Sequence, residues 1–225
     1  LQSYTIDFAE YVPKNDISKL TLIWDAIPRQ LAKKNRRFIF SHVKNGAREK
    51  DFRGALQWLI DADIVHKVER IDKPVLPLAA HANTSYFKLY FADVGLFRTH
   101  AGLPAEALLT RTPYTAEIRG ALTENYVLTE LVARDVSPVC FWRSDNRAEV
   151  DFVVQQGVSV LPLEVKAAEN TRSKSLARYQ ELYSPELAVK VSLADLRYSR
   201  SERGSLLSIP LFLVWMLPEF AGELL

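Results

Sequence analysis

Apolar residues recur every three or four positions in two stretches of the N-terminal half. Residues 17–35 and residues 48–61 each carry such a stripe and are predicted to form amphipathic helices. Two short runs rich in β-branched and aromatic residues follow, at 64–69 and 86–90, and these predict strands. The N-terminal half is therefore expected to be helical first and to end in a pair of strands.

Helices followed by a pair of strands are the pattern of a winged helix, in which one helix usually enters a DNA groove. On the second predicted helix, Arg48, Lys50 and Arg53 are the candidate nucleic-acid contacts. A basic run lies just before that helix and contains Lys33, Lys34, Arg36 and Arg37. Charge runs are also common on solvated helix faces, and winged helices also bind proteins, so the pattern leaves both interpretations open.

The pattern of apolar residues in the C-terminal half predicts one helix followed by strands. A helical pattern covers residues 117–135, and three β-like runs follow at 139–142, 148–154 and 158–165. A short loop with Gly157 joins the second and third runs, which predicts a hairpin.

Two carboxylates and a lysine fall on one side of this predicted hairpin. Alternate residues of a strand share a face, so pairing about the loop brings Asp151 near Glu164, with Lys166 on the same side. Neighbouring carboxylates repel, and Mg²⁺ or Mn²⁺ bound by their oxygens relieves that repulsion. A lysine beside such a metal can hold a phosphate oxygen or orient water, as metal-assisted phosphodiester hydrolysis requires.

The preceding helix adds a third carboxylate. Glu124 falls on its apolar face, where a charge is costly unless it is paired or binds a cation. A strand-end salt bridge between Asp151 or Glu164 and Lys166 or Arg147 is the alternative to a metal site. The Glu-x-Lys triplet alone has no specificity, because about one is expected by chance, so its strand context carries the hypothesis.

Further cations lie near this cluster in sequence. Lys174 and Arg178, one turn apart on the next predicted helix, would flank a phosphate path or form a solvated face. Arg143 would contact a phosphate or pair with Asp145 or Glu149, and the sequence does not decide between these.

Composition narrows the class of protein. The chain has 225 residues, 48% of them hydrophobic and 25% charged, which fits one or two globular domains. A net charge of +2 neither demands nor excludes a nucleic-acid partner. The single cysteine, Cys140, cannot form an intramolecular disulfide, which favours a cytoplasmic location. No membrane span, zinc site or phosphate-binding P-loop is expected, so no nucleotide site is predicted in this stretch.

Several motifs resemble, in order, the signatures of a large family of prokaryotic AAA+ ATPases. These motifs are YFKLYFADVGL at 86–96, GALTENYV at 120–127, WRS at 142–144, EVDFV at 149–153 and PLEVK at 162–166. Members carry an N-terminal ATPase, a winged-helix region and a C-terminal domain of unknown function. That last domain is similar to the PD-(D/E)XK, or restriction-endonuclease-like, nucleases.

The resemblance implies a mixed α/β (α+β) protein of two domains. Residues 1–100 would form a winged helix, and residues 101–225 a restriction-endonuclease-like domain with a mixed sheet flanked by helices. Its last strand is expected at residues 209–214, beside a run at 188–192. The ATPase domain of the same protein would precede this chain.

Position by position, the resemblance also implies a site. Glu124 matches the helix glutamate of the nucleases, Asp151 the metal-binding aspartate, and Glu164 and Lys166 the Glu-x-Lys pair. Val150 stands where a proline is usual. We expect Mg²⁺- or Mn²⁺-dependent binding or cleavage of nucleic acid, DNA rather than RNA. The alternative is a non-catalytic DNA- or protein-binding module that regulates the ATPase.

Overall fold

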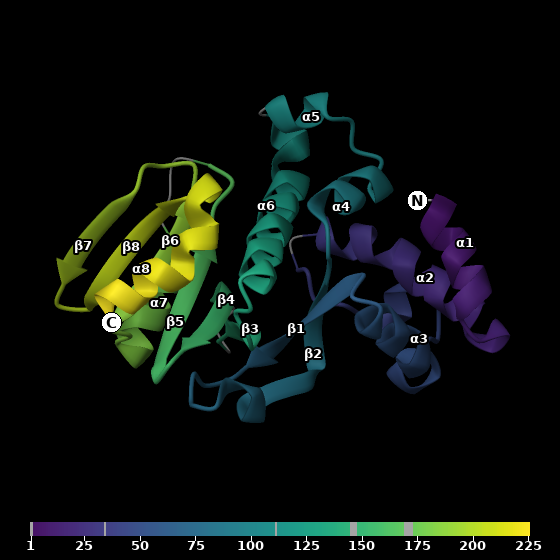
Figure 1. The fold of residues 1–225 in the computed structure, drawn as a ribbon, viewed down its shortest axis with the longest axis horizontal. Helices are drawn as coiled ribbons and strands as arrows, with labels where there is room; N and C mark the ends of the chain where they lie inside the picture. The colour runs from purple at the N-terminus through teal and green to yellow at the C-terminus, as the bar shows by residue number, and fades with distance from the viewer. Residues whose placement is uncertain (1, 34, 111, 145–147, 169–172) are drawn as a thin grey trace. The chain divides into compact units, whose positions relative to one another are not determined.

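The computed structural model describes residues 2–33, 35–110, 112–144, 148–168 and 173–225. Over these ranges the chain forms eight α-helices and eight strands (Figure 1). The helices are α1 (Gln2–Tyr11), α2 (Lys14–Leu31), α3 (Glu49–Asp61), α4 (Val94–His100), α5 (Glu106–Leu109), α6 (Pro113–Ala133), α7 (Lys174–Tyr183) and α8 (Leu217–Leu224). The strands are β1 (Val65–Ile71), β2 (Ala82–Phe91), β3 (Val139–Arg143), β4 (Glu149–Gln156), β5 (Ser159–Val165), β6 (Leu187–Ser192), β7 (Arg197–Ser201) and β8 (Gly204–Pro210). Three short 3₁₀ helices are η1 (Phe40–His42), η2 (Leu78–His81) and η3 (Leu211–Met216).

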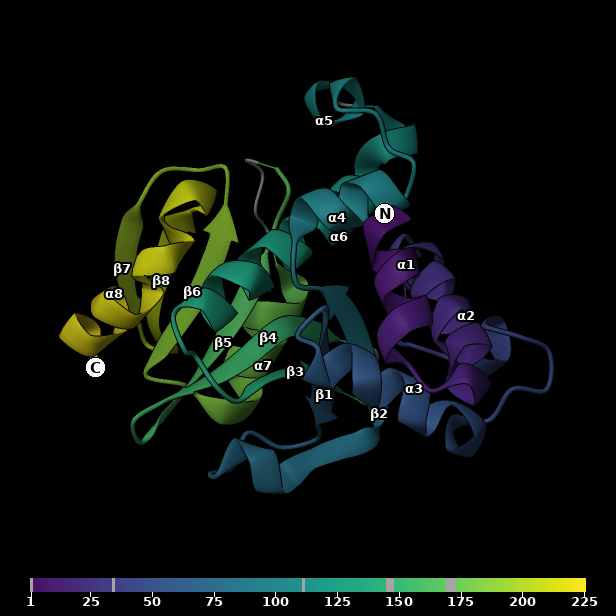
Figure 2. The same cartoon turned by 45° about the vertical axis from the view of Figure 1, so that its right-hand side comes forward.

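The strands form one mixed sheet in the order β2-β1-β3-β4-β5-β6-β8-β7. Strands β3, β4 and β5 run antiparallel as a meander, and β7 pairs antiparallel with β8. The pairs β1–β3, β5–β6 and β6–β8 are parallel. Helices α7 and α8 lie beside these strands (Figure 2). The predicted α/β class, with a mixed sheet flanked by helices, is therefore confirmed.

The chain divides into two compact units, each built from two segments. The first unit contains residues 1–67 and 87–125, and the second contains residues 68–86 and 126–225. Strands β1 and β2 and helix α6 each pass from one unit to the other. The bounds of the two predicted domains, 1–100 and 101–225, stay predictions. The predicted identities of the two domains stay predictions.

The first unit is built on the two predicted amphipathic helices. In α3 the buried stripe consists of Phe52, Ala55, Leu56 and Leu59, as the spacing predicts. Helix α2 also forms, but it begins three residues earlier than expected and contains Pro28. At its centre, the Trp24 ring lies 5.0 Å from the Phe91 ring, edge to face. Aromatic packing of this kind anchors α2 against the end of β2.

The helix-then-strand order of the winged-helix prediction is present, although β1 and β2 belong to the first unit only in part. Strand β1, however, does not end as part of a free hairpin. It continues to Ile71 and pairs in parallel with β3, with Ile71 opposite Trp142. Strand β1 is therefore the second strand of a larger sheet, with β2 at the edge. The winged helix stays a prediction.

The second unit has its core between the sheet and α7. This core contains Ile71, Leu78, Cys140, Trp142, Val150, Val153, Leu176, Tyr179 and Ala188. The predicted β4–β5 hairpin is confirmed, with Phe152 opposite Leu163 and with Gly157 at φ +58° in the turn. Glycine suits that left-handed conformation because it has no side chain to clash.

The prediction of a last strand over residues 209–214 is wrong in its bounds. Its predicted position beside β6 is confirmed. Strand β8 ends at Pro210, which lies opposite Ser192 of β6. Proline has no N–H to continue the ladder. The apolar run that follows forms η3 instead, because an unbroken apolar run does not distinguish strand from helix.

The β7–β8 turn gives a first testable prediction. Gly204 has φ +100°, and a Cβ there would lie 2.3 Å from the carbonyl oxygen of Pro185. We expect Gly204→Ala to lower the free energy of unfolding by more than about 1 kcal/mol. Gly222→Ala is the matched control, since a Cβ on Gly222 meets nothing within 4 Å. Thermal melts in which the two variants behave alike would contradict this prediction.

Over the described ranges, no helix is both long enough and apolar enough to cross a membrane.

Candidate functional site

The β4–β5 hairpin brings the predicted strand residues together. Its register continues from the Phe152–Leu163 pair to place Asp151 beside Glu164. The Val165 N–H donates to Oδ2 of Asp151 over 2.8 Å, so this carboxylate is fixed against the neighbouring strand. Asp151 is half-buried. The two acids therefore meet at the end of the hairpin away from its turn.

Glu164 and Lys166 form an ion pair at the same place, between Oε1 and Nζ. Glu164 is only 3% exposed, whereas the side chain of Lys166 is 34% exposed. The Lys166 N–H donates to the Val191 carbonyl oxygen over 2.8 Å, which fixes the end of β5 against β6. The lysine thus reaches from a buried carboxylate to solvent.

Lys190 is a fourth member of this cluster that the sequence analysis did not identify. It lies opposite Glu164 in the parallel β5–β6 pair. Burial lowers the pKa of Lys190; the charge of Glu164 opposes that shift and the charge of Lys166 adds to it. The available signal was a single lysine in the otherwise apolar run of β6. Its position across from Glu164 depended on a strand pairing that the sequence does not reveal.

The cluster holds two carboxylates and two lysines, so its charges balance. Mg²⁺ retains several waters and is often bound by only one or two carboxylates. Asp151 and Glu164 are two such carboxylates, and Glu164 is paired with Lys166. Within the part of the chain that the structure describes, no group of three or more His, Cys, Asp or Glu is placed to hold a metal. Two carboxylates are a donor set that hydrated Mg²⁺ or Mn²⁺ can use, and metal binding by Asp151 and Glu164 stays a prediction.

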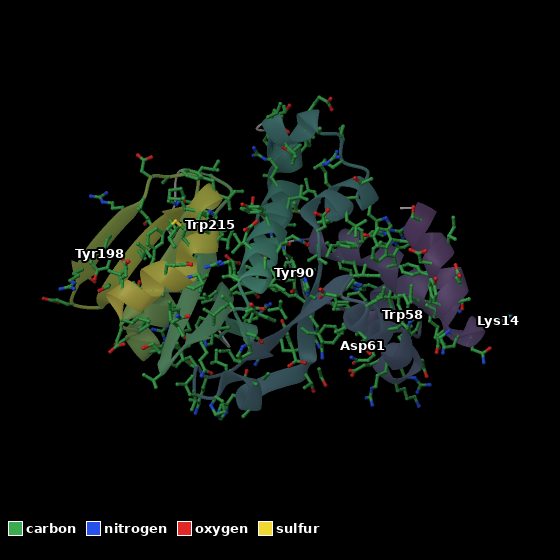
Figure 3. The ribbon with its side chains drawn as sticks, in the orientation of Figure 1. Lys14, Trp58, Asp61, Tyr90, Tyr198 and Trp215 are labelled. Atoms are coloured by element: carbon green, nitrogen blue, oxygen red, sulfur yellow. The ribbon has the colours of Figure 1, made fainter. Side chains whose placement is uncertain are left out.

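Glu124 belongs to the first unit and has its own partners there. It is 4% exposed, forms an ion pair with Arg36, and accepts a hydrogen bond of 3.1 Å from the Tyr90 hydroxyl. Tyr90 is labelled in Figure 3. A Cβ on Gly120 would lie 3.0 Å from the Arg36 guanidinium, so glycine there leaves room for the arginine. The ion pair with Arg36 therefore offsets the unfavourable free energy of burying the Glu124 carboxylate. A metal-binding role for Glu124 stays a prediction.

The residue after Glu124 holds α6 to the end of β2. The Phe91 N–H donates to Oδ1 of Asn125 over 2.9 Å, and Nδ2 of Asn125 donates to the Phe91 carbonyl oxygen over 2.8 Å. Asn125 is fully buried and completes the backbone pairing of this strand as another strand would. Both Glu124 and Asn125, within the GALTENYV motif, therefore have structural partners.

The remaining predicted cations lie on helix surfaces. Arg48 and Arg53 are exposed and each lies near an acid of α3, at 3.6 Å and 3.8 Å respectively. Lys50 on the same helix and Lys174 on α7 are also exposed. Lys34, in the basic run before α3, lies outside the described residues. Exposed cations of this kind are available to a partner, and nucleic-acid contact stays a prediction.

Two predicted cations of the second unit have acidic partners. Nη1 of Arg143 lies 3.3 Å from Oε2 of Glu149, so Arg143 has one of the two acidic partners that the sequence allowed. The other possible partner, Asp145, lies outside the described residues, as does Arg147. Arg178 on α7 lies 3.4 Å from Glu181, and its side chain is half exposed.

The surroundings of Cys140 disfavour its reactive thiolate form at neutral pH. The thiol is buried in the core of the second unit, and burial raises its pKa to about 11. The thiolate is the reactive form, so it is scarce below that pH. We expect a thiol reagent at pH 8 to label native protein about a hundredfold more slowly than protein unfolded in guanidinium. Equal labelling rates in the two states would contradict the burial of Cys140.

Comparison with known proteins gives a coarse assignment. Residues 119–212 match the family model "Domain of unknown function (DUF4143)", a domain found in AAA-ATPase-associated proteins. Residues 1–107 match another, "Domain of unknown function (DUF8612)". No curated protein matches the chain.

One solved structure with a match is "Crystal structure of protein VC1899 from Vibrio cholerae", which is 13% identical over 93% of this chain and 51% of that chain. This chain thus spans about half the length of that protein. The TM-score of 0.31 supports no inference about fold or activity. The assignment therefore rests on the DUF4143 match, which associates residues 119–212 with ATPase-type proteins.

Proposed function

We propose that this chain is the accessory part of an ATPase-type protein and that its hairpin cluster is a divalent-metal site for phosphodiester hydrolysis of nucleic acid, DNA rather than RNA. One observation carries the proposal. The pairing of β4 with β5 places Asp151 beside Glu164, and Lys166 contacts Glu164 on the same side. These are the residue types that such chemistry needs. The association with an ATPase domain is supported by the DUF4143 match.

Each residue of the cluster has a distinct task in this proposal. Asp151 and Glu164 hold Mg²⁺ or Mn²⁺, and the hydrogen bond from Val165 fixes the orientation of Asp151. When bound, the cation supplies Lewis-acid chemistry and lowers the pKa of bound water. Lys166, released from Glu164, holds a non-bridging phosphate oxygen and stabilises charge that develops there. The partial exposure of Lys166 supports this task.

A second function is favoured by the charge balance of the cluster. Glu164 is already neutralised by Lys166, and Lys190 lies opposite it. A buried carboxylate paired in this way is neutralised without any metal, and loss of its partner would be destabilising. In that case the region is a non-catalytic module that binds DNA or protein and regulates the ATPase.

Cleavage assays separate the two functions. Plasmid and single-stranded DNA are incubated with wild-type protein and with Asp151→Asn, Lys166→Met and Asp195→Asn, in Mg²⁺ or Mn²⁺. Asp195 is an exposed carboxylate and serves as the matched control. We expect Asp151→Asn to abolish cleavage and Lys166→Met to slow it about a hundredfold, with Asp195→Asn unchanged. Absence of both cleavage and metal binding in the wild type would favour the non-catalytic module.

A further inference from the structure

A basic pocket lies in the second unit, and none of the four residues of the strand cluster is among its described lining residues. It has a volume of about 510 Å³ and is lined by residues of β1, of the segment that follows β1, of β3 and of α7. Four of its lining residues are cations, namely Arg70, Lys73, Arg143 and Arg178. Asp72 is the one carboxylate among the described lining residues. Like charges gathered at a pocket are costly unless an anion joins them.

The two innermost arginines are held in place before any ligand arrives. Cζ of Arg70 lies 4.9 Å from the centre of the Tyr86 ring, and Cζ of Arg143 lies 6.0 Å from the same centre. Their side chains are each 22% exposed. An aromatic ring attracts guanidinium groups, so Tyr86 keeps the two like charges side by side on adjacent strands.

Acidic partners orient these arginines without using all of their donors. Arg70 forms an ion pair with Asp72, and Arg143 forms one with Glu149. A guanidinium has five N–H donors, and each of these pairs uses one or two of them. Arginines fixed in this way suit planar or tetrahedral oxyanions, which accept several hydrogen bonds at once.

A second hollow shares Lys73 and Tyr183 with the basic pocket. Its volume is about 410 Å³, and it is lined largely by proline, valine and tyrosine side chains. Tyr179 lines it and is 1% exposed, and its hydroxyl has no hydrogen-bond partner among the described residues. The mostly apolar walls of this hollow, beside a cationic pocket, suit the nucleoside to which a phosphate is attached.

We propose that the basic pocket binds the phosphate group of a nucleotide, with Arg70 and Arg143 as its inner contacts and Lys73 and Arg178 at its mouth. The phosphate belongs either to a nucleic-acid backbone or to a free nucleotide. This inference uses neither Asp151 nor a metal ion, so it stands or falls separately from the proposed hydrolysis.

The test is a binding measurement in EDTA, which removes any contribution from a metal site. Fluorescence anisotropy of a short labelled single-stranded oligonucleotide at low salt reports binding. The variant is Lys73→Gln/Arg178→Gln, because both side chains are exposed or half exposed and their loss leaves the core intact. The control is Arg200→Gln, an exposed arginine of β7 outside the pocket. We expect the double variant to bind about tenfold more weakly, and the control to bind as wild type does.

Competition identifies the source of the phosphate. Displacement of the oligonucleotide by AMP or inorganic phosphate at millimolar concentration indicates a free phosphate monoester. Displacement by unlabelled oligonucleotide alone indicates a backbone diester. Equal oligonucleotide affinity in the double variant and in Arg200→Gln would overturn the proposal.

Discussion

Replacing Glu124 with alanine is expected to lower the free energy of unfolding by about 3 kcal/mol or more. The substitution leaves the Arg36 side chain, which is only 16% exposed, without the carboxylate that neutralises it. It also removes the acceptor of the Tyr90 hydroxyl, which is fully buried. Loss of an interaction at each of these buried or partly buried polar groups adds its own cost. Urea unfolding followed by circular dichroism measures the change.

Two further variants define the origin of that loss. Glu124→Gln keeps an acceptor for Tyr90 but removes the charge, so its effect should be intermediate. Glu117→Ala, at an exposed position of the same helix, should change stability by no more than about 0.5 kcal/mol. If Glu124→Ala were as stable as wild type but no longer bound Mg²⁺, Glu124 would be a metal ligand and not a structural partner of Arg36.

The second large effect is expected at Trp142, whose truncation to alanine should cost about 3–5 kcal/mol. This side chain is 1% exposed. Its ring lies 5.2 Å from the Tyr179 ring and 5.8 Å from the Tyr183 ring, edge to face in both cases. Its Nε1 donates to the Tyr183 hydroxyl over 3.2 Å. Alanine would leave a cavity and would also remove that donor.

A second tryptophan provides the control for this prediction. Trp215 (Figure 3) is 42% exposed, and its truncation should cost about 1 kcal/mol or less. If the denaturant midpoints of the two alanine variants shifted equally, the packing of Trp142 against α7 would not stabilise the fold as predicted. The WRS motif would then need another explanation than core packing.

Features with a local origin could be predicted from the sequence. The buried stripe of α3 follows from residue spacing, and the β4–β5 hairpin follows from alternation about Gly157. Burial of Glu124 follows from its place on the apolar face of α6. In each case the information lies within a few residues, or within one helix or one hairpin.

Features that depend on pairing between distant segments could not be predicted. Lys190 meets Glu164 only because β6 pairs in parallel with β5. Arg70 approaches Arg143 because β1 pairs with β3, far along the chain. The ion pair between Arg36 and Glu124 could not be predicted either, because Arg36 lies in a basic run of the kind that usually forms a solvated surface. Parallel pairing leaves no short-range pattern, since its connections are long.

The central claim is that Asp151 and Glu164 hold a divalent cation, and Mn²⁺ titration followed by electron paramagnetic resonance tests it most directly. Loss of the free Mn²⁺ signal reports binding without any assumption about substrate. We expect saturable binding by the wild type and by Asp195→Asn, and its loss in both Asp151→Asn and Glu164→Gln. Wild-type protein that binds no Mn²⁺, or Asp151→Asn protein that binds it as tightly as wild type does, would contradict the account.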